Sequence, residues 1–233
     1  MKSTKLNLTS VALATSMALG GVAAVPTAAN AEVSASFAMS NMYLWRGQNI
    51  STPSPAISGS LDYGTGGFYA GIWMSSEGPF DASHETDLYF GYGGEIGGFT
   101  YDISYFKYLY PEAGDPGDLG DTDLSDVVLS VGFGPVSVSA YMGVESGSTK
   151  DDYYTVAGTF GDFTVLYGLY QSGETADGAD YSHVQLSYAF NDELTFTVSK
   201  ASDDGYGLGT ASRSTVFEED PLFQVTWAKS FSL

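Results

Sequence analysis

Carboxylates recur along this chain at positions that face away from its large apolar side chains. In the segment 85–92, Glu85 and Asp87 have the opposite parity to Leu88 and Phe90. Because successive side chains of a β-strand point to opposite faces, the acids would share one face and the apolar residues the other. The same parity places these polar side chains on an inner face: Arg46, Asp62, Glu85, Asp87, Asp102, Asp126, His183 and Gln185.

Fixed charge on an inner face becomes functional when that face lines a water-filled passage. The five carboxylates of this set outnumber its one arginine, so an open passage would favour cations or zwitterions. The alternative is that the acids pair with Arg46 or are solvated in a plugged interior, since charged lumens occur in both kinds of barrel. These residues are therefore candidate pore-lining residues, and the sequence identifies no catalytic, cofactor-binding or metal-binding residue.

Twelve segments with period-2 alternation predict the strands that would carry these residues, and no window favours a helix. The first is expected to run from Val33 to Arg46, with Tyr43 and Trp45 on its apolar face. The third, GFYAGIWMSS at 67–76, is bulky on both faces, so its orientation stays open. Downstream of residue 31, no stretch gives 18 consecutive apolar residues, so a membrane protein of this sequence could only be a closed barrel.

The connections between these segments alternate in length. Short ones lie near residue 65 and at 93–98, 134–135, 161–162 and 191–192, and long polar ones at 47–54, 76–84, 111–123, 145–151, 172–180 and 201–220. Aromatic residues gather beside the short ones, as an interfacial girdle requires: Phe99, Phe133, Phe160, Phe163, Phe190 and Phe196. A soluble sandwich has no reason to sort its loops in this way. The pattern predicts an all-β fold, a closed antiparallel transmembrane β-barrel of about twelve strands with short periplasmic turns and long extracellular loops.

The last segment, FQVTWAKSFSL, ends on an apolar row. The row resembles the signal that outer-membrane barrels present to their assembly machinery, although such signals usually close on an aromatic residue. Lys229 interrupts it; a lysine facing lipid costs about 2–4 kcal/mol at mid-depth and about 0–1 near the interface, so we expect it to snorkel towards periplasmic headgroups. Lys107 and Lys200 would do the same at the outer interface. The row that would bind the assembly machinery is Phe223, Val225, Trp227, Phe231 and Leu233.

The N-terminus and the composition indicate export. Lys2 and Lys5 precede the apolar stretch VALATSMALGGVAAV, and the small residues ANA end at position 31, so residues 1–31 are expected to be a cleaved signal peptide and 32–233 the barrel. A retained membrane anchor is the alternative. The mature chain keeps 28 acidic residues, which argues against nucleic acid as a partner. It has no cysteine, so no disulfide bond can stabilise it.

One stretch carries a family resemblance. Residues 40–76, SNMYLWRGQNISTPSPAISGSLDYGTGGFYAGIWMSS, contain an N-x-Y-x-W-R-G opening followed by PA, G-x-L-D-Y and G-F-Y-A-G-x-W. This stretch resembles the TorF family of porin-like proteins. The resemblance implies a porin-like barrel in the outer membrane of a Gram-negative bacterium, but it supplies no solute and no site residues.

Geometry limits what such a barrel could pass. Twelve strands about 4.8 Å apart and tilted about 40° give a backbone radius of about 12 Å, of which inward side chains take roughly half. We therefore expect passive diffusion of small solutes, with lipid and lipopolysaccharide as the surrounding partners; the oligomeric state stays open. The alternatives are a closed barrel with a structural or adhesive role and, third, a surface hydrolase.

Two local features bear on these alternatives. His84 lies beside Asp81 and could form a protease-like dyad, whereas Ser182 and His183 are neighbours that would point to opposite faces and cannot form a nucleophile and base pair. The acidic loop DPGDLGDTD from Asp115 to Asp123 raises a calcium hypothesis, but its spacing does not fit the twelve-residue calcium loop, so a solvated loop is the simpler interpretation.

Overall fold

The computed structural model describes residues 31–51, 54–77, 84–110, 124–144, 151–173, 180–203 and 220–233. These residues contain no helix long and apolar enough to cross a membrane. Their strands are β1 (Glu32–Ser40), β2 (Leu44–Trp45), β3 (Gln48–Asn49), β4 (Ala56–Thr65), β5 (Phe68–Ser75), β6 (Glu85–Ile96), β7 (Phe99–Leu109), β8 (Ser125–Phe133), β9 (Val136–Gly143), β10 (Asp152–Phe160), β11 (Phe163–Gln171), β12 (Tyr181–Ala189), β13 (Leu194–Asp203) and β14 (Leu222–Ser232).

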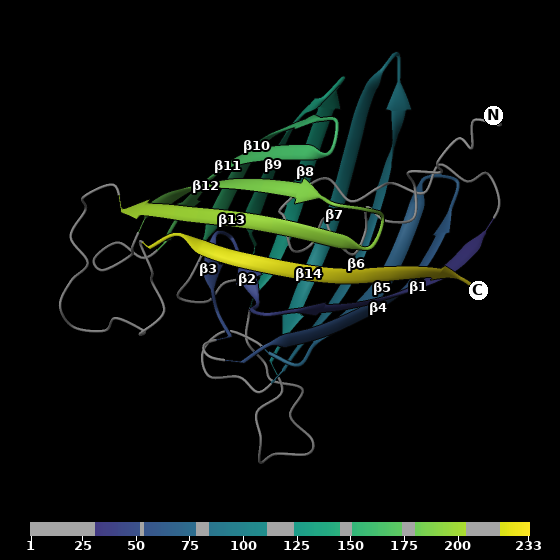
Figure 1. Ribbon diagram of the computed structural model, residues 1–233. Coiled ribbons are helices and arrows are strands. Elements are labelled where there is room, and N and C mark those ends of the chain that lie inside the picture. Colours follow the sequence, from purple (N-terminus) through teal and green to yellow (C-terminus); the bar gives the residue numbers. More distant parts are fainter. Residues whose placement is uncertain are drawn as a thin grey trace, which may run out of the picture.

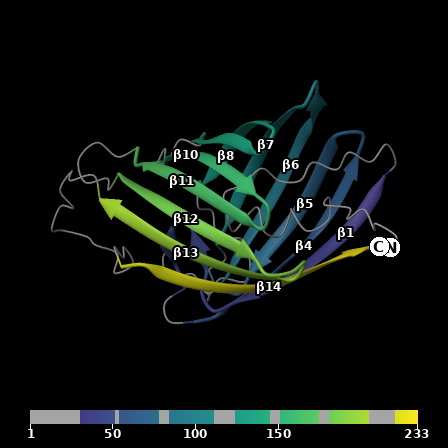
Figure 2. The ribbon, with the colours of Figure 1, turned by 45° about the horizontal axis from the view of Figure 1, so that its top comes forward.

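Twelve of these strands close into an antiparallel barrel, which confirms the predicted fold class (Figure 1). Each strand from β4 to β14 pairs with its neighbours in sequence, and β1 completes the ring by pairing with β4 and with β14. Figure 2 shows the blue strands β4 and β5 and the green strands β11–β13 on different sides of the barrel. A closed ring leaves no edge strand with unpaired backbone groups, which is the condition for crossing a membrane with strands.

The short connections are tight turns at one end of the barrel. Gly66 and Gly67 join β4 to β5 with φ of 57° and 91°, and Gly97 and Gly98 join β6 to β7 with φ of 61° and 85°. Positive φ at both central residues is the requirement of the hairpin turn whose twist matches its strands, and glycine meets it without strain. The first residue of β1 lies at this same end, since Glu32 pairs with Gly64 beside the first turn, and the last residue of β14 lies there too, since Ser34 pairs with Ser232.

The outer face of the barrel is apolar, as the alternation predicted. Phe90 and Val131 are 60% and 59% exposed on it, and the phenylalanines beside the short turns stack in pairs such as Phe99 with Phe133, at 4.5 Å between ring centroids. The orientation of the third predicted strand is now defined, because Trp73 of β5 is buried inside. The exposed apolar side chains, such as Phe90 and Val131, form the surface that hydrocarbon would cover.

The prediction for the first strand was wrong at its C-terminal end. β1 stops at Ser40, and Tyr43 and Trp45 lie in the barrel interior instead of continuing its outer face. Asn41 marks the departure: its side chain donates to the carbonyl of Phe223 at 3.0 Å and accepts from the backbone N–H of Val225 at 2.7 Å. The Asn41 side chain thus pairs with the backbone groups of Phe223 and Val225 in β14 that the backbone of β1 would otherwise pair with. The chain can therefore turn inward after Ser40.

The outward-facing Lys229 of β14 has a protein partner. Its Nζ donates a 2.9 Å hydrogen bond to Oε1 of Glu193, in the turn before β13, and Trp227 Nε1 donates to Oε2 at 3.0 Å. The hydrogen bond from Lys229, followed by that from Trp227, lowers the pKa of the Glu193 carboxyl. The lysine that interrupts the apolar row is therefore neutralised locally, while its contact with headgroups stays a prediction.

We expect Glu193→Gln to destabilise the folded barrel at neutral pH, because Lys229 loses its anionic partner on the outer face. Since the pKa of Glu193 is lower in the folded than in the unfolded chain, its contribution is present above the ordinary value of about 4.3 and is lost as the pH falls through the lowered value. Urea unfolding in lipid vesicles at neutral and acid pH measures the effect. Wild type and variant should differ at neutral pH and converge in acid, with Asp192→Asn as the control; equal stability at neutral pH would contradict the prediction.

Candidate functional site

The connection between β1 and β4 folds into the lumen as a small hairpin (Figure 1). β2 and β3 pair through Leu44 with Asn49 and Trp45 with Gln48, leaving Arg46 and Gly47 as a two-residue turn. Both turn residues have positive φ, 45° and 85°, which is the geometry of a tight β-hairpin. Glycine adopts it freely, whereas for arginine it costs roughly 1–2 kcal/mol. The contacts around Arg46 must offset this cost.

Three neighbouring strands, β12, β13 and β14, hold the hairpin from the side of the barrel next to β1. Ser199 of β13 donates its hydroxyl to the carbonyl of Gly47 at 3.1 Å, and Tyr181 of β12 donates to the carbonyl of Arg46 at 2.9 Å. Gln224 of β14 donates Nε2 to the carbonyl of Met42 at 3.0 Å. Backbone carbonyls that a β-hairpin leaves unpaired are thereby satisfied by inward side chains of the barrel wall.

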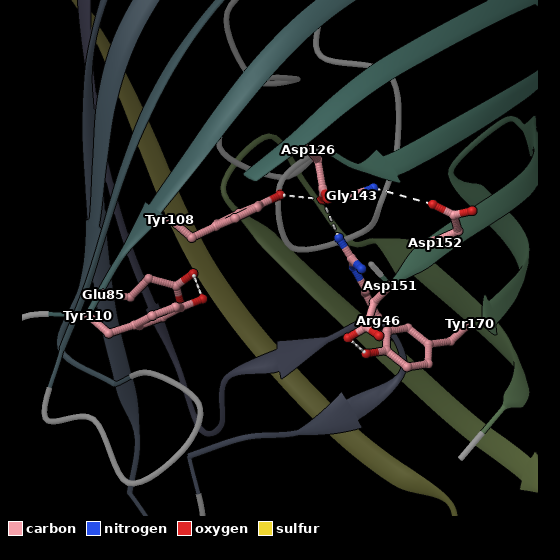
Figure 3. A network of polar contacts seen from close by, with 9 residues as sticks. All are labelled: Arg46, Glu85, Tyr108, Tyr110, Asp126, Gly143, Asp151, Asp152 and Tyr170. Carbon is pink, nitrogen blue, oxygen red and sulfur yellow. Dashed lines mark hydrogen bonds and ion pairs between the residues drawn. The ribbon is translucent and has the colours of Figure 1, made fainter. Parts of the chain in front are cut away.

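The side chain of Arg46 reaches across to β8 and forms an ion pair with Asp126 (Figure 3). Its Nη2 lies 2.5 Å from Oδ2, and the two side chains are only 8% and 7% exposed. Burial disfavours the positive charge of Arg46, and the adjacent carboxylate of Asp126 favours it. Tyr108 of β7 also donates to Oδ2 of Asp126, at 2.9 Å.

Aromatic rings surround the guanidinium group. Its carbon lies 4.4 Å from the ring centroid of Trp45, 5.1 Å from that of Tyr153, 5.6 Å from Tyr141 and 5.9 Å from Tyr170. Trp45 belongs to the hairpin, whereas the three tyrosines come from β9, β10 and β11. Ring faces attract cations at these distances. We call Asp126 and the rings of Trp45, Tyr141, Tyr153 and Tyr170 the guanidinium cage.

The ring of His183 in β12 packs against Gly47 and Gly168, and neither of these two positions has room for a side chain. A Cβ built on Gly47 would lie 2.3 Å from its Cγ, and one on Gly168 would lie 2.2 Å from its Nε2. The same Nε2 shares a 2.7 Å hydrogen bond with the hydroxyl of Tyr153. His183 therefore fixes a ring of the guanidinium cage and the turn of the hairpin at once.

The carboxylates predicted for the inner face all lie there and occupy one side of the lumen. Asp62 accepts hydrogen bonds from Tyr89 and from Ser60, and Asp102 accepts one from Tyr69 at 2.9 Å. All carboxylates that are buried in the described part of the barrel come from β4, β6, β7 and β8, and we call them the acidic wall: Asp62, Glu85, Asp87, Asp102 and Asp126. The buried polar residues of β10 and β12–β14 are neutral, mainly Ser, Thr and Gln.

Two members of the acidic wall have acceptor capacity to spare. Glu85 and Asp87 are two residues apart on β6, 1% and 4% exposed, and Oε1 of Glu85 accepts a 3.1 Å hydrogen bond from Tyr110 (Figure 3). Oε2 of Glu85 and Oδ1 of Asp87 are buried and have no hydrogen-bond partner within the described residues. Buried carboxylate oxygens without donors are costly unless a cation or a proton meets them.

The structure therefore places every predicted pore-lining residue inside the barrel. His183 and Gln185 lie on the neutral side, 1% and 2% exposed, and only Arg46 reaches the lumen from a hairpin instead of a wall strand. Lys107 and Lys200 have the outward parity that was predicted, since they pair with the exposed Leu88 and Val184. The acidic loop 115–123 lies outside the described residues, as do residues 1–30.

Sequence reasoning missed the tyrosines of the guanidinium cage. Tyr141 and Tyr153 lie on the inner parity of their strands. Tyrosine suits either a lipid interface or a polar lumen, so the residue type alone does not predict which way the ring points. The available signal was the parity itself: Tyr153 is two residues before Thr155, on the same face.

The structure defines a closed antiparallel β-barrel protein with an apolar outer face and a polar lumen. Residues 24–215 match the family described as "Bacterial protein of unknown function (Gcw_chp)", and the chain belongs to this family. The TorF name suggested by residues 40–76 stays a prediction.

Comparisons with other proteins add likenesses of fold. Among curated proteins, no sequence matches. Similar solved structures include the KdgM porin (11% identity, TM-score 0.45, covering 87% of this chain and 99% of that one). They also include the outer membrane phospholipase A from Escherichia coli (11%, 0.42, 96% and 98%) and a mutant of the Rh. blastica porin (12%, 0.40, 76% and 55%). At these identities the likeness concerns the fold alone.

We expect Gly168→Ala to lower the free energy of unfolding by about 1–3 kcal/mol, because its methyl group would collide with His183 and with the hydroxyl of Tyr153, 2.6 Å away. Gly158→Ala on the outer face of β10 is the matched control, since its nearest contact is the edge of the Phe160 ring at 3.0 Å. Urea titration of both refolded variants compares them. A loss at Gly158 equal to that at Gly168 would show that the fit around His183 is not the cause.

Proposed function

We propose that the protein is an outer-membrane channel through which small solutes diffuse passively, with a preference for cations. The observation that carries the proposal is the acidic wall, five buried carboxylates on the inside of a closed barrel whose outer face is apolar. Rings or rows of carboxylates in a water-filled passage with low-dielectric walls concentrate cations and repel anions. Asp126 is paired with Arg46, so any net negative charge of the acidic wall comes from its other four carboxyl groups.

The hairpin would form the constriction of this channel. It lies inside the wall at the end of the long connections, where Arg46 and Asp126 join it to β8 and Ser199 joins it to β13. Solutes would have to pass beside it, close to the unsatisfied oxygens of Glu85 and Asp87. Such a route suits small ions and small polar molecules.

A closed barrel with a structural or adhesive role is the second candidate. The observation that favours it is the same hairpin together with the buried aromatic side chains that pack around it, among them Tyr43 against Trp73 at 5.7 Å between ring centroids. A surface hydrolase built on His84 is the third candidate, and Asp81, the expected partner of His84, lies outside the described residues. His183 is buried in the lumen with one ring nitrogen bonded to Tyr153, and its neighbour Ser182 has the opposite parity.

The proposal includes the cellular setting. The apolar outer face would contact lipid and lipopolysaccharide in the outer membrane of a Gram-negative bacterium, reached through the periplasm after removal of residues 1–31. Phe223, Val225, Trp227, Phe231 and Leu233 of β14 and the residue after it are all on the outward parity, which supports their proposed role in binding the assembly machinery.

Planar-bilayer recording tests the channel. We expect the wild-type barrel to give discrete conductance steps, with a reversal potential in a potassium chloride gradient that shows preference for potassium. Glu85→Gln and Asp102→Asn should each lower the potassium-to-chloride permeability ratio. Asp126→Asn should lower it most, because it removes one negative charge and leaves Arg46 unpaired.

Asp192→Asn provides the control, because it makes the same charge change in the exposed turn between β12 and β13. Its permeability ratio should match that of the wild type. A folded wild-type barrel that never conducts would overturn the channel in favour of the closed barrel, and unchanged ratios in all three lumen variants would overturn the role of the acidic wall.

A further inference from the structure

We propose that the guanidinium cage is a binding site for small, flat organic cations that carry a guanidinium group, and that Arg46 occupies it as an internal ligand. The inference rests on the proposed channel and names the class of solute that its lumen recognises. The site is formed by Asp126, Tyr141, Tyr153 and Tyr170 of the wall together with Trp45 of the hairpin.

The chemistry around Arg46 is that of a cation receptor. Several ring faces lie within 6 Å of the guanidinium carbon, the nearest being Trp45 at 4.4 Å, and a carboxylate oxygen lies 2.5 Å from Nη2. Ring faces attract a cation electrostatically, and a carboxylate gives it a charge-assisted hydrogen bond. Either feature alone is common in proteins, whereas their convergence on one buried group defines a pocket for a positive charge.

The wall part of the cage is held by contacts that do not involve Arg46. Tyr108 donates to Asp126 and Tyr170 donates to Asp151 (Figure 3). Tyr153 shares its hydrogen bond with His183. These bonds fix a carboxylate and two rings from neighbouring parts of the barrel. We therefore expect the receptor to persist when the arginine side chain is absent.

Arg46, which occupies the cage, belongs to the connection between β1 and β4, and its backbone adopts an unfavourable conformation there. Arg46 sits at the tip of the hairpin with φ of 45°, a region that non-glycine residues rarely adopt. Strained residues of this kind cluster at ligand-binding and switch positions, where the surrounding contacts maintain them. An arginine that is held in a strained turn to fill a preformed receptor behaves as a ligand attached to the chain.

The form of the receptor selects among cations. Guanidinium is planar, is weakly hydrated and stacks on aromatic faces, whereas sodium and potassium keep their water and gain little from ring faces. The rings of Tyr141 and Tyr153 lie 5.5 Å apart between centroids and are inclined at 49°, so they offer two differently oriented faces to one guest. Guanidinium itself is the smallest probe that carries the relevant group.

The test uses Arg46→Ala, which removes the internal ligand. Potassium currents through wild-type and variant barrels are recorded in planar bilayers while guanidinium chloride is added in the millimolar range, with sodium chloride at equal ionic strength as the control. We expect a saturable reduction of the variant's current by guanidinium, at a concentration at least about tenfold below that needed for the wild type. Sodium should have no such effect.

Further variants locate the bound cation. In the Arg46→Ala background, Tyr141→Leu should weaken guanidinium binding by about 2- to 30-fold, and Tyr141→Phe, which keeps the ring, should bind nearly as well as its parent. Asp126→Asn in the same background should weaken it by more than about tenfold. Isothermal titration of the detergent-solubilised barrels with guanidinium chloride gives the affinities without reference to current.

The outcomes separate the inference from the channel. A conducting Arg46→Ala barrel on which guanidinium and sodium act alike would overturn the binding site and leave the channel intact. If neither barrel conducts, the channel fails, and the calorimetric titration alone decides the site. Folding is checked by the mobility shift of unheated barrels in gels; if Arg46→Ala does not refold, Arg46→Gln, which also removes the charge, takes its place in every arm.

Discussion

The pairing of β1 with both β4 and β14 is the constraint on which the rest of the structure depends. Seven register pairs, from Ser34 with Ser232 to Ser40 with Thr226, join the two ends of the barrel chain. Once the ring is closed, every side chain of the wall points either outward or inward, because the strand period is two. The large apolar side chains of the wall mostly take the outer face, and the polar and charged groups of the inward parity share one enclosed volume. The lumen site is a consequence of that enclosure.

The enclosed volume is divided by charge. β4–β8 contribute the acidic wall and β10–β14 contribute mostly neutral donors and acceptors, and the hairpin stands between them with Arg46 directed to Asp126 and its backbone directed to Ser199 and Tyr181. A buried ion pair is stable only when further hydrogen bonds and close contacts compensate for the lost water. Here the hydroxyl of Tyr108 and the surrounding rings provide that compensation.

Much of this arrangement was predictable from the sequence, and the reason is again the period of two. Parity alone assigned Asp62, Asp102 and Gln185 to the inside, and the sorting of short and long connections gave the ends of the barrel. The hairpin was not predictable in the same way. Tyr43 and Trp45 continue the parity of the outer face of β1, and Arg-Gly is a weaker signal for a tight turn than Asn-Gly or Asp-Gly. What turns the chain inward is a set of contacts with β12–β14, about 140 to 180 residues away in sequence.

The same contacts explain why the hairpin and the wall depend on each other unequally. Removing Asp126 would leave Arg46 as a buried charge without an anionic partner, and burying such a charge is among the most costly changes in a protein. Removing the Arg46 side chain leaves Asp126 with the hydroxyl of Tyr108, and the turn keeps its backbone bonds to Ser199 and Tyr181. The wall can therefore hold its geometry without the arginine, whereas the arginine cannot hold its position without the wall. That asymmetry is what distinguishes a receptor from its ligand.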